Sequence, residues 1–182
     1  MIEVRWHGRG GQGGFTAARL LGLAAALLEG RHALAFPSFG PERRGAPVLG
    51  FTRIDDHKIS DRSAVTDCDY VVVLDETLMN PQIAAGLRPH GKIVVNTATP
   101  EKYFDLAGGH EIVAVDATSL AQKILGRPIT NTAMLGALVA ASGIVRLESV
   151  IEGIQQEMKP NLARNNVEVC RRAFELGNGG TQ

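Results

Sequence analysis

Three short runs of β-branched residues limit the fold of this chain more than any other feature. Each run is continuous rather than alternating, which is typical of strands buried on both faces of a parallel sheet. The runs are YVVVLD (70–75), GKIVVNT (91–97) and EIVAVD (111–116). Between the first two we predict a crossover helix near Leu78 to Leu87. Together they predict a doubly wound α/β fold, with a mostly parallel sheet flanked by helices.

The N-terminal part of the chain predicts further strands around one long helix. The segment 15–30 is apolar on almost every side, so we expect a buried helix that ends at Gly30. Strands are predicted at 2–7, 32–37 and 48–54 from their extended apolar patterns. The predicted order of elements in this half is therefore strand, helix, strand, loop, strand.

From Asp116 onward the pattern is helical. Helices are predicted at 116–125, 130–143 and 147–158, and a last helix should start at Pro160 and end at Gly177. The sequence has no internal repeat or linker that would suggest a second domain. We therefore predict one Rossmann-like domain over residues 2–176 with a helical C-terminal part, followed by a flexible tail at 177–182.

The charge balance bears on possible partners. The chain has nineteen basic and nineteen acidic residues, a net charge of zero, so no overall electrostatic field would attract nucleic acid or an anionic membrane. The longest apolar run, Ala133 to Val145, is shorter than the roughly 20 residues that span a bilayer. The N-terminal residues also lack the pattern of a secretory signal. We expect a cytoplasmic protein that binds neither nucleic acid nor membrane.

The cysteines and histidines predict no metal site. Cys68 and Cys170 lie far apart with no C-x-x-C spacing, so they cannot hold an iron–sulfur cluster or an ordinary zinc site alone. Cys68 stands between carboxylates that disfavour a thiolate, and Cys170 should belong to the core. The histidines show no metal-binding spacing. His7, directly before a run of glycines, is the one histidine that we consider for a functional role, although we expect a structural role.

The glycine loop HGRGGQGG (7–14) joins a strand to a helix. Glycines accept positive φ, allow backbone N–H groups to converge, and point the positive end of the following helix toward an anion. Gly8, Gly10 and Gly13 have the G-x-G-x-x-G spacing, which favours phosphate binding. The alternative is a tight turn whose glycines only permit close packing.

A dinucleotide site would need one more residue, an acidic side chain at the end of the second strand. That strand ends in AFPSFG and offers no carboxylate; Glu29 precedes it and Glu42 belongs to another motif. NAD is therefore poorly supported.

The arginine loop FPSFGPERRGAP (36–47) is the second candidate region. Its prolines and glycines predict a rigid exposed loop on which Arg43 and Arg44 could hold a phosphate or a partner's carboxylate. We expect Phe36 and Phe39 to be exposed beside them, which favours an interface over a merely solvated charge cluster.

Other polar residues are explained by capping, and no catalytic set is found. Asp75 and Asp116 each end a predicted strand and should cap the helix that follows, and Asn131 should start the next helix in the same way. No Ser, His and Asp set, acid–base carboxylate pair or thiamine-type GDG signature appears. We assign no catalytic residue to the chain.

Three motifs together resemble one family. RGGQG (9–13), FPSFGPERRGAPVLGFTRI (36–54) and GRPITNTAMLGA (126–137) are similar to the gamma subunit of 2-oxoacid:ferredoxin oxidoreductases, the pyruvate and 2-oxoisovalerate branch in particular. The similarity extends over residues 2 to 176. The Gly-Pro-Glu-Arg-Arg-Gly segment favours the pyruvate-like group over the oxoglutarate-like group.

The resemblance implies a role in a larger enzyme that decarboxylates a 2-oxoacid, reduces ferredoxin and forms an acyl-coenzyme A. Thiamine diphosphate and the iron–sulfur clusters would belong to partner subunits of the alpha, beta and delta types, and this chain would be inactive alone. It would contribute subunit packing and contacts to coenzyme A. The candidate cofactor-binding residues are Gly8, Arg9, Gly10, Gly11, Gln12, Gly13, Arg43 and Arg44. A free-standing nucleotide-binding dehydrogenase and a purely structural subunit are the alternatives.

Overall fold

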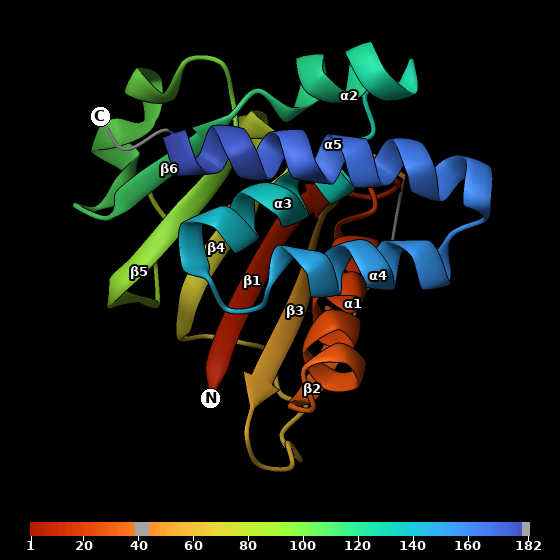
Figure 1. Ribbon diagram of the computed structural model, residues 1–182. Coiled ribbons are helices and arrows are strands. Elements are labelled where there is room, and N and C mark those ends of the chain that lie inside the picture. The colour runs from red at the N-terminus through yellow and green to blue at the C-terminus, as the bar shows by residue number, and fades with distance from the viewer. Residues whose placement is uncertain (39–43, 180–182) are drawn as a thin grey trace.

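The computed structural model describes residues 1–38 and 44–179, which form one mixed sheet with helices packed against it (Figure 1). The strands are β1 (Ile2–Arg9), β2 (His32–Pro37), β3 (Pro47–Asp55), β4 (Cys68–Val73), β5 (Leu87–Asn96) and β6 (Glu111–Val115). Their order in the sheet is β2-β3-β1-β4-β5-β6. The pairs β1–β4, β4–β5 and β5–β6 are parallel, whereas β3 runs antiparallel to both β1 and β2.

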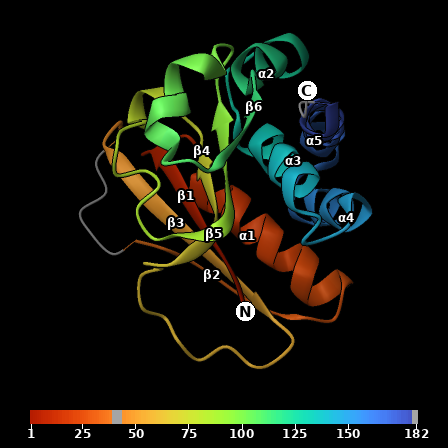
Figure 2. The same cartoon turned by 90° about the vertical axis from the view of Figure 1, so that its left-hand side faces the viewer.

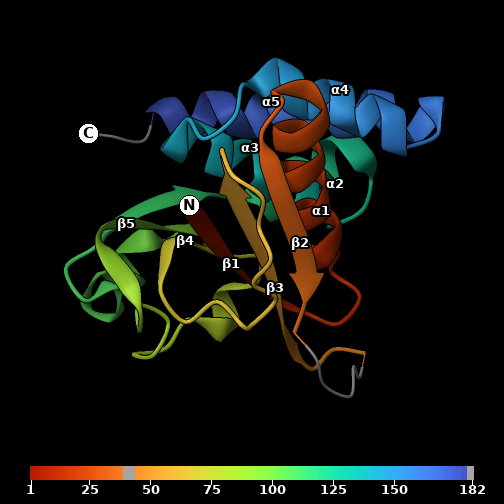
Figure 3. The same cartoon turned by 90° about the horizontal axis from the view of Figure 1, so that it is seen from below.

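The α-helices pack on one face of this sheet (Figure 2). They are α1 (Gly14–Leu23), which continues as a π-helical turn (Ala24–Leu28), α2 (Ala117–Leu125), α3 (Asn131–Ser142), α4 (Leu147–Glu157) and α5 (Pro160–Gly179). α1 lies along β2 and β3 (Figure 3), and its buried alanines and leucines share a core with Val4 and Trp6 of β1. α3 is apolar on all sides, so it can be enclosed between the sheet and α5. The predicted Rossmann-like fold class, a mostly parallel sheet flanked by helices, is confirmed, but the doubly wound arrangement is not, because the α-helices cover one face only.

Two glycines let α3 and α5 approach closely. A Cβ on Gly136 would lie 2.2 Å from the carbonyl oxygen of Cys170, and a Cβ on Gly177 would lie 2.9 Å from the Cβ of Ala140. The prediction that the last helix ends at Gly177 is wrong, because α5 continues to Gly179. Gly177 is required for helix packing and does not end the helix.

The opposite face of the sheet is covered by irregular segments and two short 3₁₀ helices, Glu76–Leu78 and Pro100–Ala107. The predicted crossover helix over 78–87 is wrong, because residues 81–86 form turns. The Asn80 side chain accepts a hydrogen bond from the Gln82 amide and starts the turn, and Gly86 has φ +74°. The local turn chemistry overrides the apolar pattern that suggested a helix.

Candidate functional site

The glycine loop lies between the carboxyl end of β1 and the start of α1. Gly11 and Gly13 have φ of +94° and +78°, which favour glycine. A Cβ on Gly13 would lie 2.6 Å from Nδ2 of Asn131, the first residue of α3. The loop therefore packs against the motif at 126–137, and Gly13 has a clear steric reason to be glycine.

The loop uses several of its own amides for internal hydrogen bonds. The Arg9 amide donates to Oε1 of Gln12 (2.7 Å), the Gln12 amide to the carbonyl of Arg9 (3.0 Å), and the Gly10 amide to the carbonyl of Ala46 (2.9 Å). Within the described part of the chain, no hydrogen bond is found to the amides of Gly11 and Gly13. These two amides lie near the positive end of α1 and can be offered to an anion.

Asp75, at the carboxyl end of β4, holds the glycine loop in place. Its Oδ2 accepts hydrogen bonds from Nε of Arg9 and Nε2 of Gln12, both at 3.0 Å. Its Oδ1 accepts from the amide (3.0 Å) and the hydroxyl (2.6 Å) of Thr77. Burial raises the pKa of Asp75, but the hydrogen bonds from Thr77, Gln12 and Arg9 outweigh burial and hold it below the ordinary value. The carboxylate is therefore ionised at neutral pH.

The guanidinium of Arg9 makes three hydrogen bonds to the protein, one from each of its nitrogens. Besides Asp75, it donates to Oγ1 of Thr77 (2.7 Å) and to the carbonyl of Gly45 (3.2 Å). Among the described residues, one N–H on each terminal nitrogen has no partner, so a phosphate could contact Arg9 without displacing these three. Of the predicted binding residues, Arg9 and Gln12 thus fix the loop in this structure.

The structure brings Arg44 to the glycine loop. Arg44 is exposed and forms a β-bridge with Gly10, and the Gly45 amide donates to the Gly10 carbonyl (3.1 Å). Two motifs that are distant in the sequence therefore form one surface. Arg43 and Phe39 lie outside the described residues.

Phe36 was predicted to be exposed, and this is wrong. Its side chain is 8% exposed, its ring centroid lies 5.2 Å from that of Phe51, and the Arg53 guanidinium lies 5.6 Å above the ring. Phe36 is in β2, whose pairing with β3 turns this ring toward the core on the face opposite the α-helices. It therefore offers no surface to a partner.

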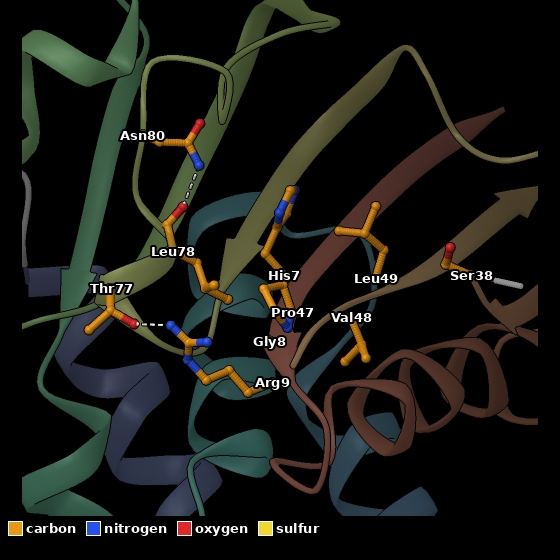
Figure 4. Close-up of a pocket in the computed structure, with 10 residues that line it drawn as sticks. All are labelled: His7, Gly8, Arg9, Ser38, Pro47, Val48, Leu49, Thr77, Leu78 and Asn80. Atoms are coloured by element: carbon orange, nitrogen blue, oxygen red, sulfur yellow. Dashed lines mark hydrogen bonds between the residues drawn. The ribbon is translucent and has the colours of Figure 1, made fainter. Parts of the chain in front are cut away.

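A cavity of about 740 Å³ opens beside the glycine loop, within the usual size range of small-molecule sites. Figure 4 shows that its wall comes from the end of β1, the start of β3 and the segment after β4. The lining residues are His7, Gly8, Arg9, Ser38, Pro47, Val48, Leu49, Thr77, Leu78 and Asn80. The cavity lies at the carboxyl ends of parallel strands, where open α/β sheets bind ligands.

The topology disfavours a dinucleotide. In the usual dinucleotide fold the second strand lies directly beside the first, and its carboxyl end reaches the ribose. Here β3 pairs with β1 on that side and separates it from β2. The end of β2 therefore cannot supply the ribose-binding carboxylate, which agrees with the absence of an acidic residue in the sequence there.

Both cysteines are buried, as predicted for Cys170, and neither forms a thiolate readily. Burial raises the pKa of Cys68 to about 11 and that of Cys170 to about 12. They belong to hydrophobic clusters on opposite faces of the sheet, so they cannot share a metal ion.

The predicted caps are confirmed for two of three residues. Asp116 accepts a hydrogen bond from the Ser119 amide at the start of α2, and Asp75 accepts one from Thr77. The capping prediction for Asn131 is wrong, because Asn131 is the first residue of α3 and its Oδ1 accepts from the Thr132 amide. Its amide group instead packs on the glycine loop.

Comparison with known proteins decides the family. The family model for pyruvate ferredoxin/flavodoxin oxidoreductase matches residues 3–176. The chain belongs to this family. The pyruvate/ketoisovalerate oxidoreductases common subunit gamma of Thermococcus litoralis is 48% identical over 179 residues, with 96% of each chain covered.

Solved structures of oxidoreductases share the fold. The crystal structure of pyruvate oxidoreductase subunit PORC from Thermotoga maritima has a TM-score of 0.85 at 42% identity and covers 96% of this chain and 95% of that one. A 2-oxoglutarate:ferredoxin oxidoreductase from Magnetococcus marinus, with 2-oxoglutarate, coenzyme A and succinyl-CoA bound, has a TM-score of 0.82 at 16% identity. This chain matches 31% of that one, and the likeness shows the fold alone.

Sequence reasoning missed two parts of the site in this member of the pyruvate ferredoxin/flavodoxin oxidoreductase family. Asp75 was assigned only to capping, although it also holds Arg9 and Gln12. A signal was present, since Asp75 ends a buried strand, where ligand sites of α/β sheets gather. The contact between Gly13 and Asn131 had no such signal.

One property of the described helices concerns membranes. Across residues 1–38 and 44–179, no helix combines the length and apolar character needed to cross a bilayer.

Proposed function

We propose that this chain is the gamma subunit of a multi-subunit oxidoreductase that converts pyruvate or ketoisovalerate to an acyl-coenzyme A and reduces ferredoxin. The observation that carries the proposal is the 48% identity to a common gamma subunit over almost the whole of both chains. In this proposal alpha, beta and delta-type subunits hold thiamine diphosphate and the iron–sulfur clusters, and the complex works in the cytoplasm. The chain itself is inactive alone.

The chain's own contribution is proposed to be coenzyme A binding and subunit packing. Arg44 is exposed next to Gly10, and the amides of Gly11 and Gly13 lie at the positive end of α1, so an anionic phosphate group fits there. The cavity beside the loop has room for the rest of an extended ligand. Coenzyme A in the Magnetococcus marinus structure is in keeping with this. Coenzyme A would supply the thiol that accepts the acyl group.

Two measurements on the purified full chain test this function. Calorimetry should detect heat with coenzyme A and none with NAD or NADP. Turnover of pyruvate should be absent for the chain alone and appear once the partner subunits are added. Turnover without partners, or binding of NAD in preference to coenzyme A, would contradict the proposal and favour a free-standing dehydrogenase.

A further inference from the structure

A small groove lies between the end of α2 and the start of α5, two helices that run side by side (Figure 1). Its lining residues come from two segments, 125–129 and 161–166, and its volume is about 290 Å³. We call it the α2–α5 groove. It shares no lining residue with the cavity beside the glycine loop, and it includes the start of the motif at 126–137, to which that cavity gives no role.

Two large apolar side chains are exposed in the α2–α5 groove. Ile129 is 43% exposed and Leu162 is 60% exposed, and both line the hollow together with Leu125. Exposed apolar side chains around a surface hollow are typical of a contact area, in which a side chain of the partner fills the hollow. The volume is just below the usual range of small-molecule sites, so it fits one such side chain better than a whole ligand.

The charge around the groove has one sign. Residues 117–147 and 158–167 contain no acidic residue. Arg127 lines the groove, and Lys123 and Lys159 are each two positions from a lining residue; all three side chains are exposed. None of the three forms an ion pair within the described part of the chain. Their charge is complementary to a partner that carries carboxylates.

The acidic residues that flank this region do not neutralise it. Glu157, which precedes the second segment, pairs with Arg19 of α1. Glu168, which follows it, pairs with Arg172 (2.9 Å). The three cations therefore remain available to a partner.

Two amide side chains can bind the backbone of a peptide segment. Asn161 and Asn165 lie one helical turn apart on α5 and both line the groove. Neither side chain has a hydrogen-bond partner among residues 1–38 and 44–179, whereas Asn166 accepts from the Thr132 hydroxyl and donates to the Leu162 carbonyl, both at 2.9 Å. An asparagine amide donates and accepts at once, as a peptide group requires.

A second copy of the chain does not suit the groove. In a two-fold contact the basic surface around Arg127 would face the same surface of the other copy, and like charges repel. The occupant should therefore be a different chain.

We propose that the α2–α5 groove docks a partner subunit of the oxidoreductase, through a segment that carries an apolar side chain and at least one carboxylate. The inference rests on the proposed function, which makes this chain one subunit of a larger enzyme. The apolar side chain enters the hollow beside Ile129 and Leu162, and the carboxylate pairs with Arg127. The amides of Asn161 and Asn165 bind the backbone of the segment.

Chemical cross-linking of the assembled complex tests the location directly. A carbodiimide joins a lysine amine to a carboxylate in contact with it. Mass spectrometry should identify bonds from Lys123 or Lys159 to an acidic residue of a partner subunit. Absence of partner bonds at both lysines overturns the inference, and so do bonds from them to a second copy of this chain.

Two variants test the chemistry through the affinity of the full chain for its partner subunits. Arg127→Glu should weaken assembly about tenfold at low salt and less at about 0.5 M salt, because it replaces attraction by repulsion that salt screens. Arg62→Glu, the same charge change on an exposed residue outside the groove, is the control and should stay within about twofold. Leu162→Ser should weaken assembly about tenfold at both salt concentrations, because the contact it removes is apolar.

The outcomes separate this inference from the proposed function. Wild-type affinity of either groove variant, or an equal loss with Arg62→Glu, overturns the inference and leaves the proposed function standing. If the wild-type chain does not assemble with the partner subunits at all, the proposed function fails and the inference fails with it.

Discussion

Asp75→Asn isolates the interaction that holds the glycine loop. Asparagine keeps an oxygen that can accept from the Thr77 amide, so the local turn after β4 is preserved. The second position becomes an NH₂ group, which faces two donors, Nε of Arg9 and Nε2 of Gln12. Asp116→Asn is the matched control, because Asp116 only caps α2 and asparagine caps equally well.

The expected cost follows from these two contacts. The Arg9 and Asp75 side chains are 32% and 18% exposed, so solvent screens their ion pair and it contributes about 0.5–1 kcal/mol. The bond from Gln12 to the carboxylate contributes about 1.5 kcal/mol. Asp75→Asn should therefore lower the free energy of unfolding by about 2 kcal/mol, or Tm by about 4–8 °C for a chain of this size. Asp116→Asn should change it by less than about 0.5 kcal/mol.

Urea unfolding of the full chain at several pH values measures both variants. The folded-state pKa of Asp75 is lowered, so its contribution is complete above the ordinary value of 3.8 and is lost as the pH falls through the folded-state pKa. The difference between wild type and Asp75→Asn should be present at pH 7 and disappear in acid. Equal stability of the two at pH 7, or a difference that persists in acid, would refute the assigned role of the carboxylate.

Two further predictions concern packing and buried charge. Gly136→Ala should destabilise the chain by about 3 kcal/mol in a thermal melt, because its Cβ would meet the Cys170 carbonyl. Gly153→Ala in α4 is the control. Its Cβ would lie 3.5 Å from the nearest neighbour, so the substitution should be neutral or stabilising in the same melt. Glu3→Ala should cost about 3 kcal/mol in urea unfolding, because the 3%-exposed Arg53 loses its 2.8 Å partner and keeps only the Asp61 carboxylate as an anionic partner, at 3.3 Å. A loss under about 1 kcal/mol would show that water replaces the pair.

The strands and most helices could be predicted because their signals are local. Continuous β-branched runs identified the parallel strands, and the glycine turn marked the junction of β1 and α1. The helix predicted at 78–87 failed because Asn80 and Gly86 form turns that a hydrophobic pattern does not register. Gly177 was misread for another reason. A glycine that ends a helix and one that admits a neighbouring helix are identical in sequence, and only the position of α3 distinguishes them.

The site was partly predictable. The glycine loop and Arg44 were identified as candidates, and the structure brings them together through the bridge between Gly10 and Arg44. The use of Arg9 and Gln12 as internal partners of Asp75 was not foreseen, because these contacts join residues more than 60 positions apart. Such distant contacts decide which amides of a glycine loop are left free for a ligand. The sequence of the loop alone therefore could not identify these amides.

The most direct test of the account is the coenzyme A KM of the assembled oxidoreductase carrying Arg44→Ala, with exposed Arg62→Ala as the control. A phosphate contact made equally in ground and transition states predicts a KM about tenfold higher with kcat unchanged, and no effect of Arg62→Ala. An intact Arg44→Ala complex with unchanged KM would contradict coenzyme A binding by this subunit. Loss of assembly together with an unchanged coenzyme A KM would show that Arg44 docks the chain and does not contact the phosphate.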